Sequence, residues 1–166
     1  MKGNMSKKPE KPIVIFTTFW DAEEILKQKH FLYGTGTAFR LKVKDNKPEN
    51  YRAYSIALSH PKDFYFVRID TFCPTYDMLM KYKEDKDWET YTKKYRDLMV
   101  ERKKEIKEWF NRLNEDFVYI LCCWENTYKG SKCHRRLLYD AVSTSKTLKD
   151  KAIYIYRHGD EGNKNL

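Results

Sequence analysis

The chain has 166 residues, with 33 Lys and Arg against 24 Asp and Glu and an aromatic fraction of 16%. The length fits one domain, and the aromatic content excludes a disordered chain. No apolar run reaches the ~18 residues of a membrane span, so we expect no membrane partner. The basic N-terminus lacks the apolar stretch of a secretory signal, so we expect a cytoplasmic protein.

The net charge of +9 is distributed unevenly along the chain. Residues 76–117 are neutral, whereas residues 1–12, 39–62 and 118–158 carry net charges of +3, +4 and +5. Such a segregated surplus predicts a positive face that attracts phosphate groups. The plain alternative is a basic protein with no acidic partner.

The first half of the chain alternates predicted strands and helices after a basic disordered tail at residues 1–12. The β-branched, apolar run that starts at Ile13 predicts a buried strand over residues 13–19. Asp21, with Glu24 three residues later, predicts the cap of a helix over about residues 21–29. Residues 31–50 give only a short alternating segment at 39–43. Strands are then expected over 51–58 and 64–69, and a helix over 75–83.

The second half begins with the clearest helical pattern. Apolar and aromatic residues recur every three or four positions over 88–113, interrupted only by Arg102, where we expect a bend. We interpret these aromatics as core contacts. A strand over 117–123, a helix over 132–143, a strand over 152–157 and a tail at 158–166 follow. The alternation predicts an α/β fold over residues 13–157: a single three-layer domain, with a mainly parallel sheet and helices on both faces.

One segment carries a resemblance to a known family. Residues 120–138 read ILCCWENTYKGSKCHRRLL, with Cys-Trp-Glu at a strand end and Cys-His-Arg at a helix start. This resembles the Domain of Unknown Function 488 family, in which a Leu-Leu-Cys-Tyr-Glu strand precedes Cys-His-Arg. Residues 16–19, 54–57 with 61–62, and 74–83 resemble further segments of that family in the same order. The resemblance implies a compact α/β fold and a Cys-His-Arg site.

The chain also departs from the family pattern in three places. Seven residues separate Glu125 from Cys133, which is more than in typical members, residues 31–50 form an insertion, and Cys73 stands where the family has Ala. These differences fall on loops that would border the site.

The sequence by itself also predicts a site where the strands end, because ligands of α/β sheets bind beyond the carboxyl ends of the strands. Basic side chains disfavour a helix N-terminus, whereas free N–H groups there attract anions. We therefore predict a bound anion, or a carboxylate partner, at the helix that begins near residue 132. The expected ligand-binding residues are Lys132, Arg135, Arg136, Thr17, Thr18 and Ser55, and the expected catalytic residues are His134, Glu125 and Cys133.

Each residue of the Cys-His-Arg motif has two interpretations. Cys133, at a helix start beside basic residues, is a candidate nucleophile of lowered pKa, or else a small packed side chain. His134 is a candidate acid or base, or else it donates a hydrogen bond to Glu125 or to a backbone carbonyl. Arg135 binds a phosphate in one interpretation and pairs with Glu125 inside the fold in the other.

The cysteines are possible zinc ligands, but their spacing does not favour a zinc site. Cys122, Cys123 and Cys133 with His134 could provide ligands, but neighbouring strand residues point to opposite faces, and the spacing matches none of the usual zinc motifs. We therefore expect reduced thiols, no metal and no other cofactor.

These features predict a protein that binds a phosphate-bearing ligand, either a nucleotide or a nucleic acid. Metal-free hydrolase or transferase chemistry at the Cys-His-Arg site would make it an enzyme. The alternative is a non-catalytic module that binds nucleotides or nucleic acid, or that regulates through protein interactions. No Walker loop, GxGxxG, HExxH or EF-hand loop is present to decide between them. The sequence gives no prediction of the oligomeric state.

Overall fold

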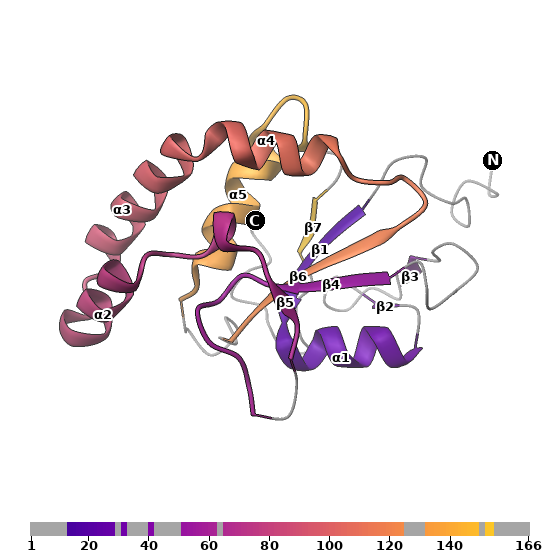
Figure 1. Cartoon of the computed structure of the whole chain (residues 1–166), viewed down its shortest axis with the longest axis horizontal. Coiled ribbons are helices and arrows are strands. Elements are labelled where there is room, and N and C mark those ends of the chain that lie inside the picture. Colours follow the sequence, from indigo (N-terminus) through magenta and orange to yellow (C-terminus); the bar gives the residue numbers. More distant parts are fainter. Residues whose placement is uncertain are drawn as a thin grey trace.

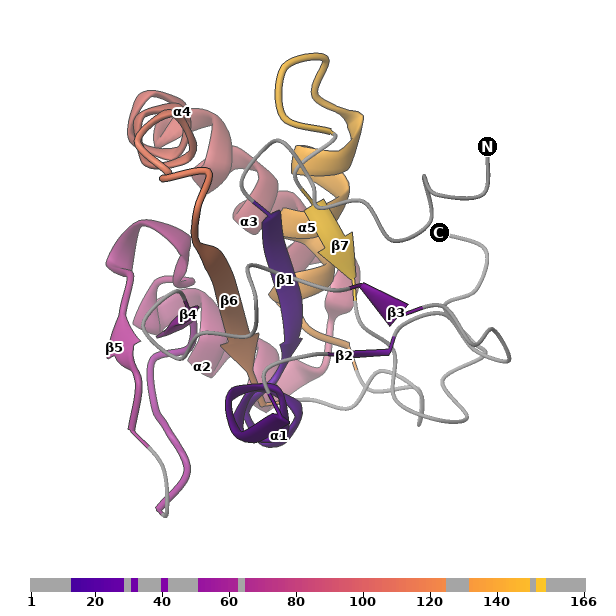
Figure 2. The same ribbon diagram turned by 90° about the vertical axis from the view of Figure 1, so that its right-hand side faces the viewer.

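The structure, a computed structural model, describes residues 13–28, 31–32, 40–41, 51–62, 65–124, 132–149 and 152–154. Five parallel strands form one sheet in the order β5-β4-β6-β1-β7 (Figures 1 and 2). They are β1 (Ile13–Thr18), β4 (Tyr51–Ser55), β5 (Val67–Arg68), β6 (Val118–Cys123) and β7 (Ala152–Tyr154). A separate antiparallel pair, β2 (Phe31–Leu32) and β3 (Arg40–Leu41), lies within the predicted insertion.

Helices cover both faces of the five-stranded sheet. The elements are α1 (Phe19–Gln28), the 3₁₀ turn η4 (Asp70–Phe72), α2 (Tyr76–Asp85), α3 (Trp88–Glu101), α4 (Lys103–Asn111) and α5 (His134–Thr144). Helix α1 lies on one face, α4 and α5 lie on the other, and α3 packs outside α5 with α2 beside it (Figures 1 and 2). This arrangement confirms the predicted three-layer α/β domain with a mainly parallel sheet.

The core lies around the central strand β6, whose six residues are all buried. A parallel sheet that is covered on both faces needs apolar side chains on both, which explains the unbroken apolar runs of β1 and β6. Full burial of one such side chain, for example Ile120, stabilises the fold by about 1.5–3 kcal/mol. The rigid centre of the sheet holds the strand ends in a fixed place.

Helix α1 begins earlier than the sequence predicted, and its cap is a different residue. The Thr18 hydroxyl accepts a hydrogen bond from the backbone N–H of Asp21 at 3.1 Å. The helix therefore starts at Phe19, directly after the strand, and the prediction that Asp21 caps it was wrong. A hydroxyl three residues before a free N–H is the usual N-cap geometry, and it lies closer to the strand end than Asp21 does.

The helical pattern over residues 88–113 forms two helices that meet at Arg102, the one charged residue in the apolar stripe. Arg102 Nη1 donates hydrogen bonds to the backbone carbonyls of Asp70, Thr71 and Cys73, at 3.1, 2.9 and 2.8 Å. The Arg102 guanidinium thus provides hydrogen bonds for the carbonyls of the η4 turn, which lies against the break between the two helices. The predicted bend is confirmed, and the guanidinium accounts for its position.

The remaining boundaries differ from the predictions by a few residues. The strand predicted over 51–58 ends at Ser55, the one predicted over 64–69 contains only Val67–Arg68, and α5 starts at His134 rather than at residue 132. Residues 1–12 and 155–166 lie outside the described residues. Among the described helices, none is long and apolar enough to cross a membrane.

Candidate functional site

A cavity of about 410 Å³ lies beyond the carboxyl ends of β4 and β6. Its wall comes from the loop after β4, the end of β6, helix α2, the start of α3 and the start of α5. Parallel pairing aligns the strand ends, with Ser55 opposite Cys122 and Thr18 opposite Cys123. The cavity therefore occupies the edge of the sheet at which α/β proteins bind ligands.

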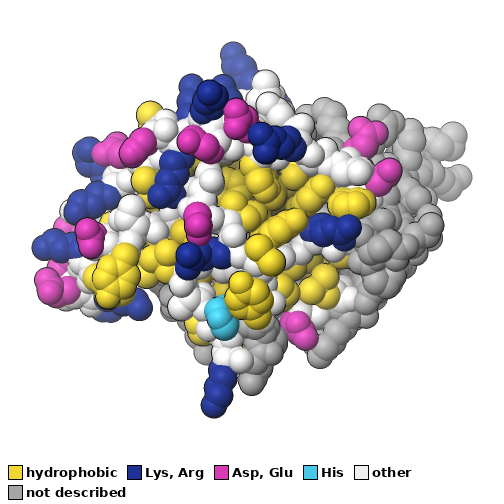
Figure 3. All heavy atoms as spheres, in the orientation of Figure 1, with side chains coloured by type: hydrophobic (Ala, Val, Ile, Leu, Met, Phe, Trp, Pro, Cys, Tyr) yellow, Lys and Arg dark blue, Asp and Glu magenta, His cyan; other side chains and the backbone are white. Residues whose placement is uncertain are grey.

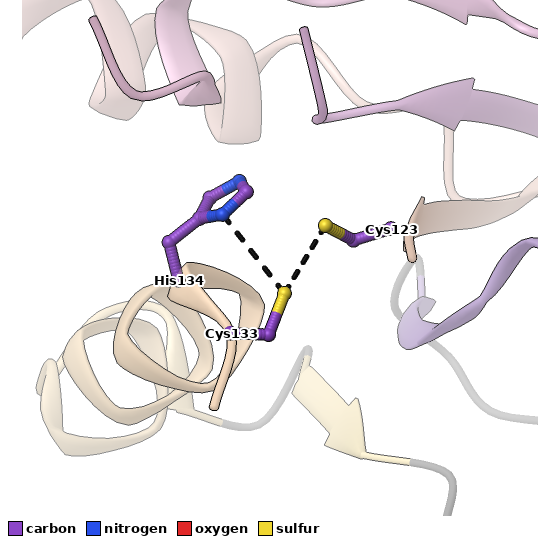
Figure 4. A group of neighbouring side chains, drawn as sticks. All are labelled: Cys123, Cys133 and His134. Carbon is purple, nitrogen blue, oxygen red and sulfur yellow. Dashed lines mark hydrogen bonds between the residues drawn. The ribbon is translucent and has the colours of Figure 1, made fainter. Parts of the chain in front are cut away.

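Three buried side chains meet at the wall of this cavity, namely Cys123, Cys133 and His134 (Figure 4). Cys123 is the last residue of β6, Cys133 is the N-cap of α5, and His134 is the first residue of that helix. The two sulfur atoms are 3.1 Å apart, and the Cys133 sulfur lies 3.9 Å from His134 Nδ1. We refer to these three residues as the Cys-Cys-His cluster.

A backbone carbonyl fixes the imidazole of His134. Its Nε2 lies 2.6 Å from the carbonyl oxygen of Ile56, just after β4. A carbonyl only accepts hydrogen bonds, so Nε2 carries a hydrogen, and in the neutral ring the lone pair is on Nδ1. The structure thus shows the backbone hydrogen bond that was one of the two interpretations of His134, and Nδ1 is the nitrogen that faces the thiols.

The surroundings of the Cys133 thiol strongly perturb its pKa. Burial alone would raise the pKa of this thiol, but the hydrogen bond with Cys123 and the neighbouring His134 and Arg135 side chains lower its pKa well below the ordinary value. The backbone N–H of Arg135 also points at the sulfur, at 3.5 Å. A thiolate at a helix N-terminus is a competent nucleophile or metal ligand.

The other two cysteines have different surroundings. Cys122, adjacent to Cys123 in the strand, points to the opposite face and donates a hydrogen bond to the Tyr54 carbonyl at 3.3 Å. Burial raises its pKa. Burial likewise raises the pKa of Cys73 to about 12. Both thiols therefore stay protonated at neutral pH, as structural cysteines do.

The predicted residues at the start of α5 have three different surroundings: the cavity, the core and the helix surface. Lys132, Cys133 and His134 line the cavity. Arg135 is only 1% exposed and belongs to the core behind the cavity wall. Arg136 is directed along the helix, where its Nε lies 3.4 Å from a carboxylate oxygen of Asp140.

The predicted polar residues of the strand ends make local hydrogen bonds. Thr18 caps α1, and the Thr17 hydroxyl donates to the Asp21 carboxylate at 3.5 Å. The Ser55 hydroxyl accepts from the N–H of Ala57 at 3.1 Å, in the turn that leads to the cavity. Thr17, Thr18 and Ser55 are buried but do not line the cavity. The predicted catalytic residue Glu125 lies outside the described residues.

Several cavity residues were not among the predicted site residues. Helix α2 supplies Lys83 and Tyr82, its C-cap supplies Lys86, and α3 supplies Trp88 and Tyr91. The last two belong to the aromatic stripe that we interpreted as core. The three-residue spacing of Lys83 and Lys86 indicated a site only weakly, because nothing in the sequence shows that α2 packs over the strand ends.

Comparison with protein families supports the motif-based resemblance. The model of the active DUF488-N3 subclade matches residues 35–146, which include the Cys-Cys-His cluster and the lysines of α2. Comparison with curated proteins and with solved structures finds no match in either. Because the match covers most of the chain, the protein belongs to the active DUF488-N3 subclade of the DUF488 family.

Proposed function

We propose that the cavity binds a nucleotide, with its phosphate held by lysines and its base by aromatic side chains. The observation that carries this proposal is the charge of the wall. Lys83, Lys86 and Lys132 line the cavity, and no Asp or Glu does among the described residues. None of the three lysines forms an ion pair with a residue that the structure describes.

Uncompensated positive charge at a concave surface attracts anions. A wall of low dielectric constant concentrates the field of the three ammonium groups in the cavity. Charge-assisted hydrogen bonds from lysine to phosphate are roughly twice as strong as neutral ones. The phosphate is therefore the part of the ligand that this wall binds most strongly.

Aromatic side chains provide the second half of the recognition. Trp88 and Tyr91 stack at 5.0 Å between ring centroids, and Tyr82 contacts the Trp88 ring edge at 5.5 Å. Trp124 lines the cavity from the end of β6, where its indole N–H donates to the Ser59 carbonyl at 3.1 Å. Each stacked base contributes about 1–3 kcal/mol to binding on such surfaces. A volume of about 410 Å³ fits a small ligand of this kind.

Nucleotide binding can be measured by quenching of tryptophan fluorescence and by calorimetry. Nucleoside 5′-monophosphates should bind to the full chain, and both the nucleoside without phosphate and inorganic phosphate should bind more weakly. The affinity should fall as salt increases, because the lysine–phosphate attraction is screened. A short single-stranded oligonucleotide distinguishes a free nucleotide from a nucleotide within nucleic acid.

Two lysines on the same helix provide a matched comparison. Lys83→Ala removes a cavity lysine and should weaken nucleotide binding by about tenfold, or ~1.4 kcal/mol. Lys81→Ala removes an exposed lysine that pairs with Asp85 at 3.6 Å and does not line the cavity, so the affinity should be unchanged. Equal effects of the two substitutions, or no binding of any nucleotide by the unsubstituted chain, would refute the proposal.

A further inference from the structure

The Cys-Cys-His cluster has a chemistry that nucleotide binding does not use. We propose that Cys123, Cys133 and His134 bind a zinc ion at the wall of the cavity. The three ligand atoms, two Sγ and one Nδ1, all lie within 4.8 Å of one another. This proposal stands independently of the proposed function, because none of the three lysines takes part in it.

The distances are close to those that a tetrahedral zinc site requires. Zinc bonds of ~2.3 Å to sulfur and ~2.0 Å to nitrogen place two sulfurs about 3.8 Å apart, and a sulfur and a nitrogen about 3.5 Å apart. The corresponding distances here are 3.1 Å between the sulfurs and 3.9 Å between Cys133 Sγ and His134 Nδ1. Cys123 Sγ and the His134 ring nitrogen lie within 4.8 Å of each other, so small side-chain rotations would bring the three ligand atoms to zinc-binding distances.

The imidazole has the orientation of a metal ligand. Metal-binding histidines usually donate their second ring N–H to a carbonyl or carboxylate, which fixes the tautomer. His134 makes such a bond from Nε2 to the Ile56 carbonyl at 2.6 Å, so the lone pair is on Nδ1, which faces the Cys133 thiol at 3.9 Å. The Tyr95 ring packs against the imidazole at 5.2 Å and restricts its rotation.

Zinc is the metal that this ligand set favours. Thiolate and imidazole ligands suit zinc, whereas magnesium and calcium need oxygen ligands. Two thiolates and a neutral imidazole balance the double positive charge, so the buried centre would be neutral. Zinc binding would release the thiol protons.

Among the described residues, three protein ligands are available, as in catalytic zinc sites, whereas structural sites have four. Cys123, Cys133 and His134 are each at most 5% exposed, yet all three line the cavity. The fourth position therefore faces the cavity, where a water molecule or a ligand oxygen would complete the tetrahedron. Cys122 and Cys123 point to opposite faces of the strand, but one of them is sufficient because Cys133 and His134 provide the other two ligands.

Cobalt titration of the full chain tests the site in the absence of any nucleotide. The protein is purified with a reductant, freed of metal, and titrated with Co²⁺ and then with Zn²⁺. We expect a sulfur-to-cobalt charge-transfer band in the near ultraviolet, d–d bands of tetrahedral intensity, loss of both on addition of Zn²⁺, and about one zinc per chain by elemental analysis. Absence of the charge-transfer band in the unsubstituted chain would overturn the proposal.

Neighbouring cysteines provide the control. Cys123→Ser and His134→Ala should each weaken Co²⁺ binding at least about tenfold, with folding checked by circular dichroism. Cys122→Ser changes a thiol on the opposite face of the strand and should leave the cobalt spectrum unchanged. If Cys122→Ser abolishes the spectrum in folded protein, or if Cys123 and Cys133 prove to be joined in a disulfide under reductant, the zinc proposal is wrong. Lys83→Ala should leave the cobalt spectrum unchanged. The zinc proposal and the nucleotide proposal can therefore be refuted independently of each other.

Discussion

Two adjacent arginines of α5 show how much the surroundings of a residue decide its role. Arg135 is 1% exposed and is the largest of the fully buried side chains, whereas Arg136 is partly exposed and lies beside Asp140. The sequence predicted a ligand contact for both, with a pair inside the fold as the alternative for Arg135. The structure places one in the core and the other on the helix surface, so substitution of each should have a different result.

Arg135→Ala should lower the free energy of unfolding by roughly 3–5 kcal/mol, because an enclosed charged side chain leaves both a cavity and uncompensated surroundings when it is removed. Chemical denaturation of the variant measures this loss. Arg136→Ala is the matched control and should cost at most about 1 kcal/mol, as expected of a partly exposed ion pair. A normally stable Arg135→Ala protein that loses nucleotide affinity would instead support the predicted phosphate contact.

At the scale of single elements, the start of α3 depends on the charge of one carboxylate. Asp87 is the N-cap, and its carboxylate accepts hydrogen bonds from the N–H and the hydroxyl of Thr90, at 3.1 and 2.6 Å. These bonds lower the pKa of Asp87 below its ordinary value of 3.8. The folded state therefore stabilises the ionised Asp87 carboxylate more than the unfolded state does.

The consequence is a pH-dependent contribution to stability. Because the pKa is depressed, the contribution is present above about pH 4 and is lost as the pH falls through the lowered pKa. Asp87→Asn keeps an acceptor for the cap but removes the charge. The melting temperature of the natural chain should exceed that of the variant at pH 7, and the gap should close in acid. A gap of constant size between pH 7 and pH 2 would contradict this prediction.

The sequence predicted those elements whose pattern depends on burial alone. β1 and β6 are apolar on both faces, and the Arg102 break interrupts a regular stripe, so all three were found. β5 was placed only approximately, because a two-residue edge strand whose residues are both exposed carries no alternation. Boundaries at Thr18 and Cys133 depend on which side chain caps the helix, and several neighbouring residues were eligible.

The candidate site was predicted in part for a similar reason. Lys132, Cys133 and His134 stand at the start of the helix that follows the central strand, and the carboxyl edge of the sheet is a general site. Lys83, Lys86 and Trp88 reach the cavity only because α2 and α3 fold back over that edge. Arg135 had two interpretations, a phosphate contact and a place inside the fold, because a basic segment does not show which side of the helix faces the core. A local sequence pattern does not show which distant elements pack together.

At the scale of the whole molecule, the surface over the neutral segment 76–117 has no excess of one charge. Figure 3 shows basic and acidic side chains interspersed over α3 and α4, which belong to the neutral segment 76–117. Half of the net charge of +2 in residues 39–50, and all of the surplus in residues 1–12, lies outside the described residues. Lys83, Lys86 and Lys132 form one positive group that the described structure places at a concave site.

Sheet position should determine how each strand opens to solvent. β6 is central, fully buried and bonded to a strand on both sides, whereas β5 and β7 are the edges of the sheet. Amide hydrogen exchange followed by mass spectrometry or NMR should find β6 at least about tenfold slower than β5. The reason is that edge strands open with little loss of buried contacts. Equal protection of β5 and β6 would show that the sheet opens only as a unit.

The place of β1 in the sheet also affects how the chain can fold as it is synthesised. β1 leaves the ribosome early, but both of its neighbours are late: Ile13 pairs with Val118 of β6, and Val14 pairs with Ala152 of β7. At ~5–20 residues per second, the apolar strand is without a native partner for about 5–20 seconds. Contacts so distant in sequence also slow folding, and an unpaired apolar strand is a template for wrong pairing. Nascent chains that end before β6 should therefore need chaperones.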